Sequence, residues 1–120
     1  MLGSTRQVAV WCFNQPVDMR KSFDGLYALV RDGFGRDPMS GDLFVFVGRD
    51  RRRAKVLHWD GTGLCVYAKR LESSKFAAPW KMTGETTLRL TATELALFLE
   101  GSELVGKVAL SPPEFRWKSS

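Results

Sequence analysis

The sequence contains little cysteine and histidine, and this limits the chemistry available to it. Its 120 residues include two Cys and one His. Cys12 and Cys65 are too few for a disulfide-rich scaffold, and neither stands at metal-ligand spacing from another cysteine or a histidine. Because both lie in apolar strand-like runs, we expect two buried, reduced thiols and a cytoplasmic protein. The sequence predicts no metal and no cofactor.

Long apolar segments and nucleotide-binding motifs are also missing. The N-terminus lacks the apolar region of a signal peptide, and no apolar run has the length of a membrane span, so we expect no membrane partner. No G-x-x-x-x-G-K-[ST] loop is present, and Gly33-Phe34-Gly35 is too short for a nucleotide fingerprint. His58 stands beside Trp59 with no nucleophile marked by a motif. These absences predict a protein that is not an enzyme.

Scattered aspartates leave one catalytic alternative open. Gathered around magnesium, they would resemble the site of a two-metal nuclease. Each also has a local explanation as a cap, helix pair, loop residue, charge balance or turn residue, so a metal-dependent nuclease is the less favoured reading. The five are Asp18, Asp24, Asp42, Asp50 and Asp60.

The composition is that of one packed, basic domain. The chain is 44% hydrophobic and 26% charged, which is ordinary for a soluble globular protein. We expect a single domain over residues 1–120, with its core at about 7–104 and a flexible C-terminal tail at about 111–120. The formal net charge of +5 favours an anionic partner, with nucleic acid ahead of a membrane surface.

Residue periodicity predicts both strands and helices. A helix is expected from Asp18 to about Arg31, with Asp18 as its N-cap and Arg20 paired to Asp24. A second helix opens at Thr91, where Glu94 completes a capping box. Short apolar or alternating runs predict strands at Val8–Phe13, Leu43–Val47, Lys55–Trp59, Leu64–Lys69 and Thr86–Leu90.

These elements predict a small α+β fold. The turn Asp60-Gly61-Thr62-Gly63 joins two strand-like runs into a central β-hairpin. The simplest packing is a mostly antiparallel sheet covered by an N-terminal and a C-terminal helix. Residues 72–85 show no clear period and are expected to form a long connection, with Phe76 and Trp80 fixing it to the body.

Cations gather around the expected hairpin. We call seven of them the basic ribbon, and Arg20 and Lys21 join it from the N-terminal region. Clustered guanidinium groups suit bidentate phosphate contacts, and Phe76 and Trp80 can stack on bases if they are exposed. The structural alternative is that these charges only protect a sheet edge from aggregation. The basic ribbon comprises Arg49, Arg51, Arg52, Arg53, Lys55, Lys69 and Arg70.

Three stretches together resemble a known family. PVDMRKSFDGLYALV (Pro16–Val30), the run Asp37–Glu72 with LFVF, K-x-L-x-W-D-G-x-G and K-R-L-E, and SSKFAAPW (Ser73–Trp80) are similar to the accessory protein encoded beside the transposase in a class of bacterial insertion sequences. That family is labelled TnpB or Orf2-like and is distinct from the RNA-guided nucleases of the same label. The resemblance covers most of the chain from Trp11 to about Leu104.

The resemblance implies a role in transposition, with the separately encoded transposase carrying the catalytic acids. The family supplies no active-site residues to transfer to this chain. We therefore expect a non-catalytic accessory protein that contacts DNA through the basic ribbon, at element ends or non-specifically, and assists the transposase. The alternative is an adaptor that grips the transposase or another element-encoded protein through the helix Met19–Phe34 or exposed aromatics, without binding DNA.

Overall fold

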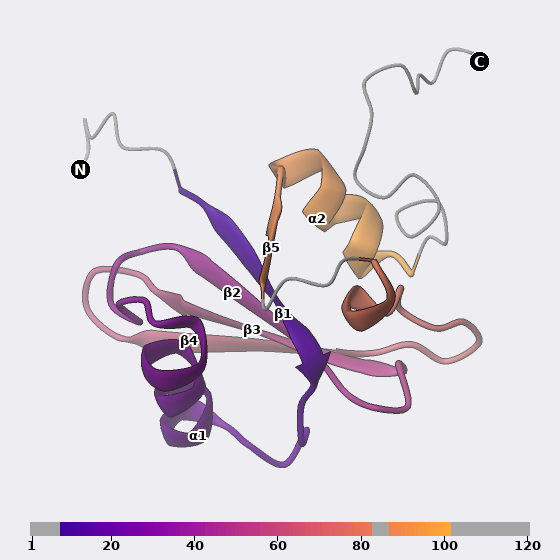
Figure 1. The fold of residues 1–120 in the computed structure, drawn as a ribbon, viewed down its shortest axis with the longest axis horizontal. Helices are drawn as coiled ribbons and strands as arrows, with labels where there is room; N and C mark the ends of the chain where they lie inside the picture. Colours follow the sequence, from indigo (N-terminus) through magenta and orange to yellow (C-terminus); the bar gives the residue numbers. More distant parts are fainter. Residues whose placement is uncertain (1–7, 83–86, 102–120) are drawn as a thin grey trace.

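The computed structural model describes residues 8–82 and 87–101 and contains a five-stranded sheet (Figure 1). The strand order is β4-β3-β2-β1-β5, and three of the four neighbouring pairs are antiparallel. With the helical segments, this makes a small α+β domain. The strands are β1 (Val10–Pro16), β2 (Leu43–Val47), β3 (Arg53–Trp59), β4 (Leu64–Arg70) and β5 (Thr87–Leu90).

The chain enters the sheet through a β-α-β unit. β1 and β2 pair in parallel, and the segment between them contains the α-helix α1 (Phe23–Ala28) and the π-helical turn η1 (Leu29–Phe34). Parallel neighbours need such a crossover, because a tight turn reverses the chain direction. The expected hairpin forms between β3 and β4, but it lies at one edge of the sheet and not at its centre. β2 is the central strand.

The first helix begins later than the sequence pattern indicated. It starts at Phe23 and its N-cap is Ser22, so the prediction of Asp18 as the N-cap is wrong. Asp18 instead folds back on its own chain, accepting hydrogen bonds from the backbone N–H and the guanidinium of Arg20. Arg20 therefore lies in the turn before α1, and its carboxylate partner is Asp18 and not Asp24.

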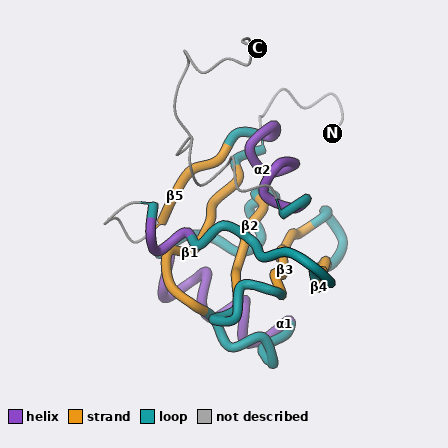
Figure 2. Tube along the Cα trace, turned by 90° about the vertical axis from the view of Figure 1, so that its right-hand side faces the viewer, coloured by secondary structure: helices purple, strands orange, loops and turns teal. Residues whose placement is uncertain are grey.

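Two apolar clusters lie on opposite faces of the sheet. Alternation along β2 sends Phe44 and Phe46 to one face, where they pack with Leu26 and Val30 of the α1–η1 segment. Val45 and Val47 point to the other face and share a cluster with Phe98 of α2 (Ala92–Leu99). Figure 2 shows α1 and α2 on either side of the strands.

The second helix begins where the sequence predicted. The Thr91 hydroxyl accepts the Glu94 N–H at 3.1 Å, and the Glu94 carboxylate accepts the Thr91 N–H at 2.8 Å. This reciprocal capping box satisfies two amides that the helix cannot pair internally. Gly101 follows the helix with a φ of 78°, the left-handed conformation that favours glycine.

The connection after β4 is fixed by apolar packing. Phe76 is fully buried and stacks on Phe98 with ring centroids 5.3 Å apart. It therefore holds the connection to the body as predicted, but the suggestion that it stacks on bases is wrong. Trp80, half-buried in the short 3-10 turn η2 (Pro79–Lys81), packs against the same cluster. The expected flexible tail at 111–120 lies outside the described residues.

Candidate nucleic-acid interface

A shallow basic groove lies where β2 ends and β3 begins, on the face that also carries α1. Two open pockets of about 330 and 250 Å³ form it, and both are lined by Met19 and Arg53. Met19 is 7% exposed, which gives the groove an apolar floor. We define the basic groove by the cations that line these pockets on this face, Arg49, Arg53, Lys55 and Arg70.

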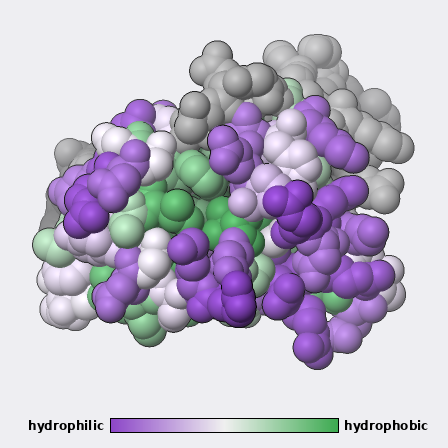
Figure 3. Space-filling model, turned by 60° about the horizontal axis from the view of Figure 1, so that its bottom comes forward, coloured by the Kyte–Doolittle hydropathy of each residue, from purple (hydrophilic) through white to green (hydrophobic). Residues whose placement is uncertain are grey.

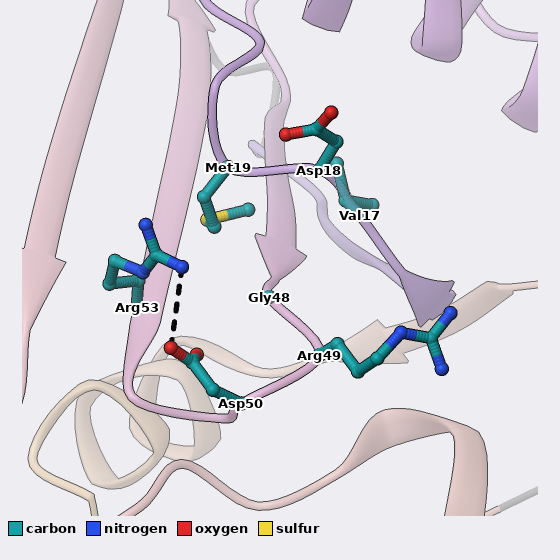
Figure 4. A pocket seen from close by; sticks show the side chains of 7 residues that line it. All are labelled: Val17, Asp18, Met19, Gly48, Arg49, Asp50 and Arg53. Atoms are coloured by element: carbon teal, nitrogen blue, oxygen red, sulfur yellow. Dashed lines mark hydrogen bonds and ion pairs between the residues drawn. The ribbon is translucent and has the colours of Figure 1, made fainter.

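Figure 4 shows how the larger pocket is arranged. Arg53 and Asp50 face each other on one side of Gly48, and Arg49 extends away on the other side. Gly48 is required here by close packing, because a Cβ added to it would lie 2.7 Å from Met19 Cγ. In Figure 3, where the lower side of the Figure 1 view comes forward, hydrophilic groups surround a smaller hydrophobic area.

Two arginines of the basic ribbon serve the fold. Arg51 has a φ of 62°, and its Nε donates to the Phe76 carbonyl at 2.8 Å. The Phe76 N–H in turn donates to the Arg51 carbonyl at 2.7 Å. Arg52 holds the strand end through its carbonyl, which accepts the Leu71 N–H. Both residues fix the β2–β3 turn to the connection after β4. Substitution of Arg51 removes a side-chain bond and so tests the fold before it tests binding, whereas substitution of Arg52 keeps the backbone bond and loses a side-chain bond of 3.4 Å to the Glu72 carbonyl.

Strand alternation divides the remaining cations between the two faces. Arg53 pairs with Arg70 and Ala54 pairs with Lys69 in the β3–β4 register. Lys69 therefore points to the α2 side, where its Nζ donates to the Leu99 carbonyl at 2.7 Å. Lysine at a helix C-terminus satisfies a free carbonyl and interacts favourably with the helix dipole. Lys69 lines the smaller pocket, but its ammonium group is hydrogen-bonded to the C-terminal end of α2.

Carboxylates oppose three of the arginines. Arg53 contacts Asp50 at 3.3 Å and Arg70 contacts Glu72 at 3.1 Å, in ion pairs whose side chains are about half exposed or more. Like charges directly opposite on a sheet repel, and these two acids offset the repulsion between Arg53 and Arg70. The third pair joins Arg20 to Asp18 at 2.8 Å. A phosphate would compete with each carboxylate for a guanidinium that is already oriented.

Other cations at the groove keep their charge uncompensated. Arg49 and Lys21 are exposed, and neither side chain makes an ion pair or hydrogen bond within the described residues. Lys55 donates its Nζ to the Lys21 carbonyl at 2.8 Å, a neutral acceptor that leaves the positive charge in place. This bond also ties β3 to the turn before α1. Arg49, Lys21 and Lys55 are therefore the cations most available to an anion.

The acids around the groove are held in the ionised state. Hydrogen bonds from the Arg20 side chain and backbone lower the pKa of Asp18 far below its usual range. The pKa of Asp50 is lowered first by the Arg52 N–H, which donates to its Oδ1 at 2.9 Å, and also by the Arg53 charge. Carboxylates that stay charged are poor proton donors or acceptors near neutral pH, so neither is suited to general acid–base work.

The geometry elsewhere gives little support to catalysis. Within residues 8–82 and 87–101, no three His, Cys, Asp or Glu side chains gather in a group able to hold a metal. Cys65 is exposed, contrary to expectation, and its thiol donates to Asp60 Oδ2 at 3.5 Å. Local desolvation and the Asp60 carboxylate raise the pKa of Cys65, which disfavours the nucleophilic thiolate. Cys12 is buried as predicted.

Most of the chain is similar to one protein family. Residues 8–108 match the family described as IS66 Orf2 like protein. The chain belongs to the IS66 Orf2-like family. This confirms the resemblance to the insertion-sequence accessory proteins, and it makes the protein one associated with an insertion sequence.

Two relatives of this IS66 Orf2-like chain come from Sinorhizobium fredii (strain NBRC 101917 / NGR234). The uncharacterized protein y4jC is 37% identical over 101 residues, which is 84% of this chain and 85% of the relative. The uncharacterized protein y4hO is 34% identical over 101 residues, 84% of this chain and 86% of the relative. No solved structure matches the chain significantly.

Sequence reasoning missed the floor of the groove. The helical spacing from Asp18 to about Arg31 predicts Met19 on the apolar face of a helix, whereas Met19 lies in the turn before α1. A glycine directly after a buried strand often marks a close backbone approach, so Gly48 was a usable signal. No comparable signal reveals Met19, because its position depends on the turn that Asp18 forms with Arg20.

Proposed function

We propose that the protein is a non-catalytic accessory factor of insertion-sequence transposition that contacts DNA through the basic groove. The observation that carries the proposal is the pair of uncompensated cations that line the two open pockets of the groove, Arg49 and Lys55, with the exposed Lys21 next to Lys55. Membership of the IS66 Orf2-like family supplies the process. The basic groove supplies the surface through which the protein would contact DNA during transposition.

The groove suits the DNA backbone better than the base edges. Guanidinium and ammonium groups at its rim match phosphate oxygens, and such contacts position a protein without reading a sequence. Both pockets are open to solvent above the apolar floor at Met19, so they do not enclose a nucleotide. We therefore expect similar affinity for element ends and for unrelated duplexes, with the transposase supplying target choice and chemistry.

A gel-shift titration of paired charge variants tests the DNA contact. Lys21→Ala/Arg49→Ala removes one exposed charge that lines the groove and one next to it, and Lys75→Ala/Lys81→Ala removes two exposed charges from the connection after β4. We expect the first variant to bind element-end and random duplexes more weakly, by the same factor, and the second to resemble the parent. Equal effects of the two variants would show that net charge alone is responsible.

A protein adaptor is the second candidate, and one exposed aromatic favours it. Phe23, the first residue of α1, is 47% exposed, whereas the helical pattern places it on the buried face. An exposed aromatic at a helix start can anchor a partner protein. Two results together would support the adaptor over the DNA-binding factor. The protein would co-purify with the transposase and Phe23→Ser would not, and the unmodified protein would give no gel shift with DNA.

A further inference from the structure

A second basic surface lies on the α1 face, at the opposite end of β2 from the basic groove. Trp11 of β1 stands between Phe44 of β2 and Arg89 of β5 in the strand register. Arg36 follows the glycine that ends η1 and reaches the same place.

The Trp11 ring is fixed in position. Its Nε1 donates to Asp42 Oδ2 at 3.3 Å, and Asp42 Oδ1 accepts the Ala9 N–H at 3.1 Å. Asp42 is only 7% exposed, so this anchor lies inside the protein. The inner side of the indole packs against the Phe44 and Phe46 cluster. With its polar atom satisfied and one side packed, the ring offers its remaining face to Arg36.

Two guanidinium groups share this ring. The guanidinium carbon of Arg36 lies 3.5 Å from the ring centroid, which is a stacking distance, and that of Arg89 lies 5.3 Å away. Both arginines are exposed, and neither makes an ion pair or a side-chain hydrogen bond within the described residues. The Arg36 N–H donates to the Val30 carbonyl at 3.1 Å, so its backbone is also held. The indole therefore holds the guanidinium of an exposed residue close over its ring.

A guanidinium held over an aromatic ring is a surface on which nucleobases can stack. Single-stranded nucleic acids are bound by stacking bases on aromatic rings or arginine planes, with nearby cations on the backbone phosphates. A duplex keeps its bases stacked on one another and offers only phosphates to such a surface. We infer that Trp11, Arg36 and Arg89 form a binding site for single-stranded nucleic acid, with a base on Arg36 and a phosphate on Arg89.

Replacing Arg36 by lysine tests this site, because lysine keeps the charge and loses the planar stack. Fluorescence anisotropy would follow a labelled oligo-dT and a duplex of equal length, with the parent, Arg36→Lys and the control Arg31→Lys. Arg31 is an exposed arginine of η1, five residues before Arg36, and is paired with Asp32. We expect Arg36→Lys to weaken oligo-dT binding at least about fivefold and to leave the duplex unchanged. Arg31→Lys should alter neither.

The outcomes separate this site from the basic groove. The inference is overturned if the parent does not bind oligo-dT, if Arg36→Lys leaves oligo-dT binding unchanged, or if it weakens both ligands equally. Should Arg36→Lys fail to fold, Arg89→Ala replaces it. Because phosphates of either ligand can reach Arg89, this variant should weaken oligo-dT binding more than duplex binding, and an equal loss for the two ligands overturns the inference. If the parent binds oligo-dT but no duplex, the DNA contact proposed for the basic groove is contradicted, whereas the site at Trp11, Arg36 and Arg89 is supported.

Discussion

Replacing Gly48 by alanine tests whether the floor of the basic groove is as closely packed as the structure indicates. The added Cβ would lie 2.7 Å from Met19 Cγ, well inside van der Waals contact. The contacted atom is near the root of the methionine side chain, so rotation of its end cannot relieve the clash. Met19 must turn about χ1, or the loop that carries it must move.

The cost follows from the burial of Met19, which is 7% exposed. Overpacking a buried site by one methyl group usually costs about 1–3 kcal/mol, because side chains leave their rotamers and the backbone shifts. The alanine backbone itself adds no strain, since Gly48 is not among the glycines of positive φ. We therefore expect Gly48→Ala to lower the free energy of unfolding by about 1–3 kcal/mol.

Urea denaturation at neutral pH measures this loss, and Gly63→Ala is the matched control. A Cβ at Gly63 meets nothing within 4 Å, and its backbone also avoids positive φ. That variant should be neutral or slightly stabilising, because alanine restricts the unfolded chain. If the two variants have the same urea midpoint and the same slope, Met19 is not held against Gly48 and the groove floor is wrongly placed.

Three further results are expected. Arg51→Ala should lower the free energy of unfolding, measured in urea, by about 1.5–3 kcal/mol, because the charged donor to the Phe76 carbonyl is lost. Arg53→Ala is the comparison variant, and an equally small loss of stability in both variants would contradict the structural role of Arg51. Asp50→Asn should tighten DNA binding in a gel shift, since it removes the charge facing Arg53 and keeps the Oδ1 acceptor, and Asp24→Asn should not. Hydrogen bonds from the Thr62 and Gly63 N–H groups lower the pKa of Asp60 to about 2, so its stabilisation of the turn is complete above the ordinary pKa near 3.8 and disappears as pH falls through about 2. An NMR pH titration that follows the Thr62 amide should show a midpoint near pH 2. A midpoint near pH 3.8 would contradict the hydrogen bonds from Thr62 and Gly63 to Asp60.

Local sequence signals predicted the elements whose stabilising contacts are local. The β2 range is as expected, because its run of aromatic and β-branched residues is continuous and buried on both faces. The capping box at Thr91 is also confirmed, since both of its hydrogen bonds span three residues. The hairpin turn at Asp60 belongs to this group, as its hydrogen bonds reach Thr62, Gly63 and Cys65, all within five residues.

Contacts distant in sequence explain what could not be predicted. The parallel pairing of β1 with β2 depends on how the α1 crossover packs, and the chain around Asp18 fits a helix start and a turn equally well. The position of Lys69 could have been derived from strand alternation, which separates it from Arg70. Its bond to Leu99 could not, because those residues are 30 positions apart. The role of Arg51 depends on Phe76 in the same way.

The salt dependence of duplex affinity tests the central claim most directly. Each phosphate contact contributes about 0.9 to the slope of log K against log salt concentration. If Lys21 and Arg49 each contact a phosphate, the slope of Lys21→Ala/Arg49→Ala should be shallower than that of the parent by about 2. Lys75→Ala/Lys81→Ala should keep the parental slope. Parallel lines for all three proteins would contradict the basic groove as a DNA contact.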